Sequence, residues 1–262
     1  MILSPPRAVF GQTIAVRAAL GVLALFAAGI SILIAVGSNP SEFPGVQVAA
    51  AVLVVYAGLC YAIGRTTVSV FPEGVQRSSV FGTQELLWSD IAEYRYRITP
   101  RMGAGWAIGG LIGAAVESAV QARMKIPAGP PNLTLIGQNG KKIRITANFK
   151  DSDEAIDMIL EEVHSLLKPE LKRRLANREE VAFGPLRLSF QGVTWKNKKP
   201  IPLDELDWAG IAGRKFCVRQ KGKLFGSLAV PPEKIPNAML ALELIEGLRV
   251  NAGLSAVSET FA

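Results

Sequence analysis

Two uncharged apolar segments near the N-terminus constrain this chain more than any other feature of its sequence. The first covers residues 18–36 and the second residues 46–63, and a short link rich in proline and glycine separates them. Each segment has about the 20 residues that a helix needs to cross the hydrocarbon layer of a bilayer. Because a spanning segment must satisfy its own backbone hydrogen bonds, we expect both to be helices in lipid. The sequence therefore predicts a transmembrane helical hairpin over residues 1–65.

Small residues recur at helical spacing within both segments. Such rows let two helix backbones approach closely in lipid, so we expect the two helices to pack on each other. A cleaved signal peptide is the alternative for the first segment, since residues 35–37 are small enough for cleavage. A second apolar segment does not normally follow a signal peptide at once, which favours the hairpin. The candidate helix-packing residues of the hairpin are Ala27, Ser31, Ala35, Gly58 and Ala62.

The flanking charges predict the orientation of the hairpin. Arg7 and Arg17 precede the first segment and Arg65 follows the second, whereas the link between them carries only Glu42. Since positive residues stay on the cytoplasmic side, we expect both termini and all residues after 65 to be cytoplasmic. The chain has two cysteines, too few for a disulfide framework.

The remainder of the chain shows a pattern that occurs twice. Residues 68–75 and residues 186–193 each read as an alternating strand, a turn with glycine and a second strand. The next match stays open, because residues 86–91 align with 201–206, or residues 88–91 with 208–211. Further strands are predicted over residues 92–98, 133–136, 142–146, 214–219 and 224–230.

Each copy ends in an amphipathic helix. Asp151 and Glu154 suit the start of the first helix, and its apolar stripe runs to Leu167. Pro236 suits the first turn of the second helix, which ends near Gly253. The pattern therefore predicts two domains after the hairpin, over residues 66–177 and residues 178–262.

The strand order, a central element with Trp88 and Ile91, and one closing helix per copy resemble the bacterial pleckstrin-homology-like (PH-like) domains. The resemblance covers residues 67–250 in two tandem copies. It implies an α+β membrane protein of the bacterial inner membrane, in which antiparallel β-domains follow the hairpin and act as interaction modules. No catalytic residue carries over. The first hairpin loops, residues 71–74 and 189–192, hold no basic residue, unlike those of PH domains that bind phosphoinositides.

A stretch over residues 100–131 interrupts the first copy and is absent from the second. Gly105, Gly109 and Gly113 lie four residues apart in an uncharged run, the pattern of a glycine zipper. One interpretation is a helix packed on the hairpin or on another copy, which would make the protein an oligomer. A flexible loop is the alternative. A nucleotide-binding loop is disfavoured, because the glycine spacing has one residue too many for the dinucleotide fingerprint.

The sequence offers little chemistry. His164 is the single histidine and lies on the first closing helix beside Glu161 and Glu162, where we expect it to be solvated. No cysteine and histidine cluster has zinc spacing, and neither a phosphate-binding loop nor a nucleophile elbow occurs. We therefore expect no catalytic residue, no metal and no cofactor, and predict that the protein is not an enzyme.

The net charge is +7, and the basic residues are unevenly distributed, with one cluster at the junction of the two copies and others in the second copy. These basic residues form either a solvated face or a contact with anionic lipid, worth ~1 kcal/mol per residue. Nucleic-acid binding is disfavoured because exposed aromatic residues are not interleaved with the charges. The candidate anionic-lipid contacts are Lys196, Lys198, Lys199, Lys221 and Lys223.

These observations lead to one expected function and one alternative. We expect a membrane-anchored, non-enzymatic interaction or scaffold module, which associates with itself or with another membrane protein in a larger assembly. The alternative is a module that binds lipid headgroups or handles lipids at the inner leaflet.

Overall fold

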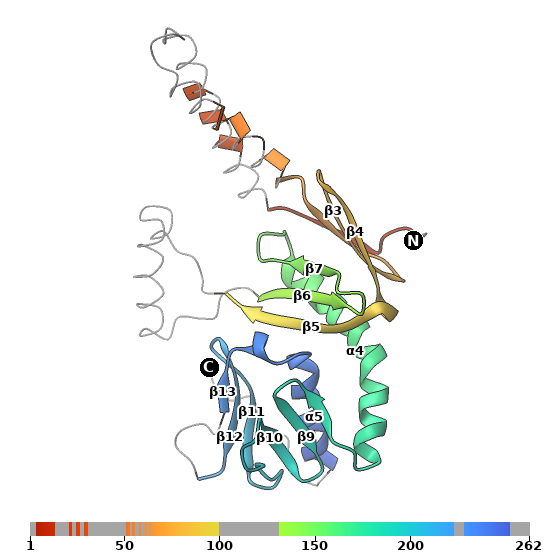
Figure 1. Ribbon diagram of the computed structural model, residues 1–262, viewed down its shortest axis with the longest axis vertical. Coiled ribbons are helices and arrows are strands. Elements are labelled where there is room, and N and C mark those ends of the chain that lie inside the picture. Colours follow the sequence, from red (N-terminus) through yellow and green to blue (C-terminus); the bar gives the residue numbers. More distant parts are fainter. Residues whose placement is uncertain are drawn as a thin grey trace. The chain divides into compact units, whose positions relative to one another are not determined.

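The computed structural model of the chain describes residues 4–13, 64–99, 131–222 and 228–251, with a few helical positions between residues 21 and 62 (Figure 1). The chain divides into two compact units. Unit 1 comprises Met1–Leu87 and Ile145–Ala155, and unit 2 comprises Trp88–Arg144 and Ile156–Ala262. Unit 2 thus includes residues from both sides of the predicted boundary at 177/178. The predicted domains stay predictions.

Unit 1 contains a four-stranded antiparallel sheet in the order β1-β2-β3-β4. Its buried apolar side chains include Val68, Val75 and Leu86, which are at most 2 % exposed. A side chain at Gly74 would meet the carbonyl oxygen of Leu86 at 2.4 Å, so the close approach of β3 and β4 requires glycine there. The strands are β1 (Ala8–Gly11), β2 (Thr67–Val70), β3 (Gly74–Ser79) and β4 (Gly82–Leu87).

Strand β1 was not expected from the sequence. It pairs with β2 in antiparallel register from Ala8 opposite Val70 to Gly11 opposite Thr67. Past its end, the amide of Thr13 donates to the carbonyl of Asn148 at 3.0 Å, and the amide of Lys150 donates to that of Gly11 at 2.8 Å. A four-residue strand has too short a pattern to be recognised locally, and its partners lie far along the chain.

The predicted transmembrane hairpin is wrong as an account of the architecture that the structure describes. Across the described residues, no helix has both the length and the apolar character that crossing a membrane requires. The two-span fold class is therefore corrected: as far as the structure describes the chain, it consists of β-sheets with two long helices. The inner-membrane location, which depended on the two spans, is not supported either. Most of residues 18–36 and 46–63 lie outside the described residues. The prediction relied on hydropathy, which reports the apolar character of a segment and does not itself establish a spanning helix.

Unit 2 begins with a short 3-10 helix, η1 (Trp88–Asp90), and a three-stranded sheet in the order β5-β6-β7. Its strands confirm the predicted ones to within two residues. The turn between β6 and β7 is built by Asn139, whose side chain accepts from the amide of Lys141 at 2.9 Å, and by Gly140 with φ of 77°. The strands are β5 (Ile91–Ile98), β6 (Pro131–Gly137) and β7 (Lys142–Ile145).

Helix α4 (Ser152–Ala176) confirms the first predicted helix and extends it. Its buried stripe begins at Ala155 and Ile156 and returns at helical spacing. Pro169 lies inside the helix and has no amide hydrogen, so the bond that would reach the carbonyl of Ser165 is missing. Beyond this point, Leu171 and Leu175 pack against the core described next.

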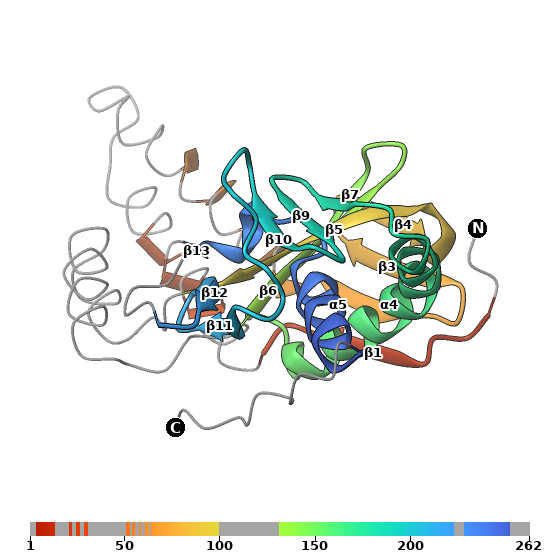
Figure 2. The same cartoon turned by 90° about the horizontal axis from the view of Figure 1, so that it is seen from below.

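The second set of strands in unit 2 forms two three-stranded sheets, in the orders β10-β9-β8 and β11-β12-β13. A 3-10 helix, η2 (Pro232–Lys234), precedes helix α5 (Ala238–Asn251), which begins two residues after Pro236. Figure 1 and Figure 2 show α5 beside the second half of α4. The strands are β8 (Val181–Phe183), β9 (Leu186–Ser189), β10 (Gly192–Trp195), β11 (Leu206–Ala212), β12 (Lys215–Gln220) and β13 (Leu228–Val230).

One hydrophobic core joins these two sheets to α5. Helix α5 contacts both β11 and β5, so it lies against strands from both sets of unit 2. Burial on this scale supplies the main favourable free energy of folding. The fully buried side chains of this core include Leu186, Leu188, Leu206 and Phe216.

Candidate functional site

Tyr94 lies in β5 with none of its surface exposed, and its backbone is held by Asn237. The Tyr94 amide donates to Oδ1 of Asn237 at 2.8 Å, and the Asn237 amide donates to the Tyr94 carbonyl at 2.9 Å. Asn237 has φ of 52°, a left-handed conformation that asparagine tolerates better than most residues. Both polar groups of the Tyr94 backbone therefore have a partner at the start of α5.

The side chain of Tyr94 reaches the same helix. Its Oη accepts from the amide of Leu240 at 3.0 Å. This amide belongs to the first turn of α5, where a helix has no carbonyl of its own to bond. An asparagine before a helix normally caps such an amide with its own side chain. Here the two residues exchange partners: Asn237 bonds the backbone of Tyr94, and Tyr94 caps the helix.

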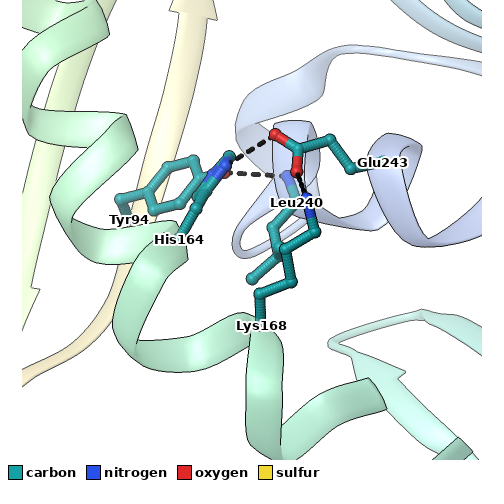
Figure 3. Close-up of polar contacts among 5 residues, drawn as sticks. All are labelled: Tyr94, His164, Lys168, Leu240 and Glu243. Atoms are coloured by element: carbon teal, nitrogen blue, oxygen red, sulfur yellow. Dashed lines mark hydrogen bonds and ion pairs between the residues drawn. The ribbon is translucent and has the colours of Figure 1, made fainter.

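From Tyr94 the contacts continue through His164 of α4 to Glu243 of α5 (Figure 3). Oη of Tyr94 lies 2.7 Å from Nε2 of His164, and Nδ1 of His164 lies 2.7 Å from Oε1 of Glu243. Nζ of Lys168 pairs with Oε2 of Glu243 at 2.6 Å. We call the side chains of Tyr94, His164, Glu243 and Lys168 the relay. They join β5, α4 and α5.

The hydrogen-bonding chemistry of the partners determines which atoms of the relay carry hydrogens. A carboxylate only accepts, so Nδ1 of His164 carries the hydrogen that it donates to Glu243. Nε2 of the neutral imidazole then accepts the hydroxyl hydrogen of Tyr94. Burial lowers the pKa of His164, although Glu243 opposes this shift, and the ring stays neutral. Burial also raises the pKa of the Tyr94 hydroxyl, which keeps its proton.

Glu243 is the charged member of the relay together with Lys168. Partial burial raises the pKa of the Glu243 carboxyl, but the hydrogen bond from Lys168 and the contact with His164 outweigh it, so the pKa falls below its usual range. The carboxylate is therefore ionised at neutral pH. It is also the member closest to water, with 41 % of its side chain exposed.

A tyrosine, a histidine and a glutamate in series resemble an acid-base relay, but their surroundings favour a structural role. A catalytic group must reach a proton on its substrate. Oη of Tyr94 is buried, and Leu240 and His164 already use its acceptor and its donor. In the part of the chain that the structure describes, no group of three His, Cys, Asp or Glu side chains could hold a metal ion.

An open groove begins where the relay ends. It has a volume of about 740 Å³ and runs between the second half of α4 and α5. Lys168 and Glu243 line one part of it, so the relay fixes two of its charges. Phe190 and Val250 are 49 % and 53 % exposed and belong to its lining. The other lining residues are Lys172, Leu175, Ala176, Leu244, Glu246, Gly247, Leu248 and Asn251.

This site was not predicted from the sequence. We expected His164 to be solvated, but it is 8 % exposed, so that expectation is wrong. Its two polar partners, Tyr94 of β5 and Glu243 of α5, come from other elements and could not be identified from α4 alone. The available signal was Leu160 and Leu167, which lie four residues before and three residues after His164 on the apolar face of an amphipathic helix.

Most of the predicted helix-packing residues lie outside the described part of the chain. Gly58 and Ala62 are described as helical, the first exposed and the second buried. The role of both stays a prediction. Those outside the described residues are Ala27, Ser31, Ala35, Gly105, Gly109 and Gly113.

The predicted lipid-contacting lysines lie away from the relay. Lys196, Lys198, Lys199 and Lys221 are exposed, and Lys223 lies outside the described residues. The first three occupy the loop after β10 and the fourth follows β12. None of them lines the groove.

A comparison with protein families gives one match. Residues 116–253 match DUF6585, which is described as a family of unknown function. The match covers a little over half of the chain, from before β6 to the end of α5, and includes every member of the relay except Tyr94. No curated protein and no solved structure matches the chain.

Proposed function

The chain belongs to DUF6585, a family of unknown function, and we propose that its unit 2 is a non-enzymatic protein-interaction module. The observation that carries this proposal is the open groove between α4 and α5. Its lining is mostly apolar and includes exposed large side chains, and the charged pair of Lys168 and Glu243, held in place by His164, lies at one part of it. The membrane anchoring expected from the sequence is not part of this proposal.

The character of the groove favours a protein as its ligand. Exposed large apolar side chains that lie together mark interaction sites more often than chance exposure does. Phe190 lies at the groove and is about half exposed, and aromatic residues, phenylalanine among them, are enriched in protein interfaces. The groove lies along two helices, a shape that suits an amphipathic helix from a partner.

The charges of the groove indicate which helix fits. Glu243 is neutralised by Lys168 at 2.6 Å, and Glu246 by Arg249 at 3.2 Å. Lys172 is exposed and has no ion pair within the described ranges. The uncompensated charge of the groove is therefore positive. We propose that its occupant is a partner's amphipathic helix with an acidic residue beside its apolar face.

A peptide experiment on the full chain tests this function. The probe is a helical peptide with leucines at i, i+3, i+4 and i+7 and an aspartate beside them, and its binding is followed by fluorescence anisotropy. We expect Phe190→Ser and Lys172→Glu each to weaken binding by about tenfold or more. Leu166→Ser and Lys142→Glu change exposed residues outside the groove and serve as matched controls.

Three outcomes would contradict the proposal. One is equal binding of a peptide whose leucines are replaced by serine. Another is unchanged binding by both groove variants. The third is a dimer of the protein alone that Phe190→Ser dissociates, since the occupant would then be a second copy of this chain.

A further inference from the structure

A second hollow lies in unit 2, next to the loop that follows β10. It has a volume of about 320 Å³ and shares no lining residue with the groove. Its walls are mostly apolar, and two lysines stand among them. The lining residues are Val193, Trp195, Lys198, Lys199, Ile201, Gln220 and Leu228.

Backbone hydrogen bonds hold the loop after β10 in place, which we call the lysine loop because it carries Lys196, Lys198 and Lys199. Val193 and Ile201 exchange two bonds, at 2.9 and 2.8 Å, which close the loop at its base. Within it, the amide of Lys198 donates to the carbonyl of Trp195 at 3.1 Å, and the amide of Lys196 donates to that of Pro185 at 2.6 Å. The hollow is therefore formed before any ligand arrives, as small-molecule sites usually are.

Gly192 shows how closely the loop is packed. It has φ of 139°, and a side chain there would lie 2.0 Å from the carbonyl oxygen of Ile201. Only glycine satisfies both conditions, so the position of the lysine loop over the end of β10 depends on this residue.

The loop concentrates positive charge without compensation. Lys196, Lys198 and Lys199 are exposed, and no ion pair to them occurs in the part of the chain that the structure describes. Like charges at this spacing repel, and an anion between them would remove the repulsion and gain charge-assisted hydrogen bonds. Because the walls next to these lysines are apolar, a ligand with both an anionic group and an apolar part fits the hollow better than a purely polar ion.

We propose that this hollow binds a free anionic amphiphile, a fatty acid of medium length. Its alkyl chain lies against Trp195 and the aliphatic walls, and its carboxylate lies between the amines of Lys198 and Lys199. The hollow is at the small end of ligand sites, which span about 300–1,000 Å³, so it accepts one short chain and not a two-chain lipid. This inference concerns a different site from the groove and does not depend on the groove binding a helix.

Calorimetric titration of the full chain with hexanoate, octanoate, decanoate and dodecanoate, below their micelle-forming concentrations, tests the proposal. Affinity should rise by about fourfold for each buried methylene and level off when the hollow is full. Decanol, which has the same chain without the charge, should bind at least about tenfold more weakly than decanoate.

Variants locate the site. Changing Lys198 and Lys199 together to Gln should weaken decanoate binding by about tenfold or more. Changing Lys141 and Lys142 together to Gln is the matched control, because that pair is also exposed and adjacent, and it should leave the affinity unchanged. Trp195→Ala should weaken decanoate more than hexanoate, since the longer chain makes more contact with the ring.

The proposal is overturned if affinity does not depend on chain length, or if the Lys198 and Lys199 double variant binds decanoate normally. It is also overturned if acidic phospholipid vesicles bind with strong salt dependence while no free fatty acid binds. The loop would then attract anionic surfaces by charge alone.

Discussion

At the residue scale, Tyr94 and Asn237 illustrate how unit 2 satisfies its buried polar groups. Each residue supplies what the other element lacks: the asparagine bonds the backbone of β5, and the tyrosine hydroxyl caps α5. Buried polar groups stabilise a fold only when they are bonded, and an unbonded one costs about 1–3 kcal/mol. The relay is therefore sensitive to the loss of single atoms.

Tyr94→Phe removes one such atom. It leaves the amide of Leu240 and Nε2 of His164 without their partner, so we expect the free energy of unfolding to fall by about 1–3 kcal/mol. Urea denaturation measures this change. A double-mutant cycle with His164→Leu is the control, because the two changes should couple by at least about 0.5 kcal/mol if the side chains act together. Additive effects would show that the Tyr94–His164 contact contributes nothing.

The buried, neutral His164 also predicts a pH dependence. Its pKa in the native state is below the 6.5 that it has when unfolded, so between these values the unfolded state binds more protons. This contribution to stability is fully present above about pH 6.5 and is lost as the pH falls toward the native pKa. Glu243 adds a further loss of stability only below about pH 4.5, the usual pKa of its carboxyl, because its pKa in the native state is lower.

We therefore expect the urea midpoint to decline as the pH falls from about 7.5 to 5, and the slope to be smaller in His164→Gln. A midpoint that rises on acidification would contradict a neutral histidine. An equal slope in wild type and variant would assign the effect to other groups.

At the scale of elements, α4 belongs to two environments. His164 belongs to the relay, whereas Leu167 and Leu171 pack against the core that joins the two C-terminal sheets of unit 2 to α5. Helix α5 has a comparable double role, since its start is bonded to β5 and its apolar face covers the other two sheets. The relay thus lies where these two helices and β5 meet.

The start of α5 provides a test at this scale. Asn237→Leu removes the acceptor for the Tyr94 amide and places a bulky residue in a left-handed conformation, so we expect a loss of about 2 kcal/mol. Asn237→Asp keeps an oxygen at the same position and should retain most of the stability. Thermal unfolding of the two variants distinguishes them, and equal stability of both would show that the side-chain bond is unimportant.

At the scale of the whole molecule, unit 2 is assembled from residues that are distant in the sequence. It takes β5, β6 and most of β7 from before α4, and β8 to β13 from after it. The predicted boundary at 177/178 separates Asn237 from Tyr94, and Glu243 from His164 and Lys168. Contacts of high sequence separation of this kind make the two predicted copies depend on each other.

A fragment of residues 178–262 should therefore be less stable than the same residues in the full chain. In that fragment, the start of α5 loses Tyr94, and Glu243 loses both of its partners. We expect the amides of the first turn of α5 to exchange at least about tenfold faster in the fragment, measured by native-state hydrogen exchange. Equal protection in fragment and full chain would support two independent domains at the predicted boundary.

Local regularity allowed much of this fold to be predicted. The apolar stripe after Glu154 predicted α4, the alternating pattern predicted β5 and β6, and Asn139 with Gly140 predicted the turn between β6 and β7. Each of these features depends on neighbours within a few residues, so the sequence contains the whole signal. The exposure of Lys196, Lys198 and Lys199 follows in the same way, since three lysines in four residues are rarely buried.

Contacts between distant residues decided the rest. Strand β1 exists because β2 pairs with it, and the burial of His164 is completed by Tyr94 of β5 and Glu243 of α5. The exchange of partners between Tyr94 and Asn237 and the hollow beside Trp195 likewise join residues far apart in the chain. The length of two apolar runs and the charges beside them predicted a membrane hairpin, whereas the described residues contain no helix that could cross a membrane. The sequence by itself determined the local elements, whereas burial and bonding between them depend on three-dimensional proximity, which only the tertiary structure provides.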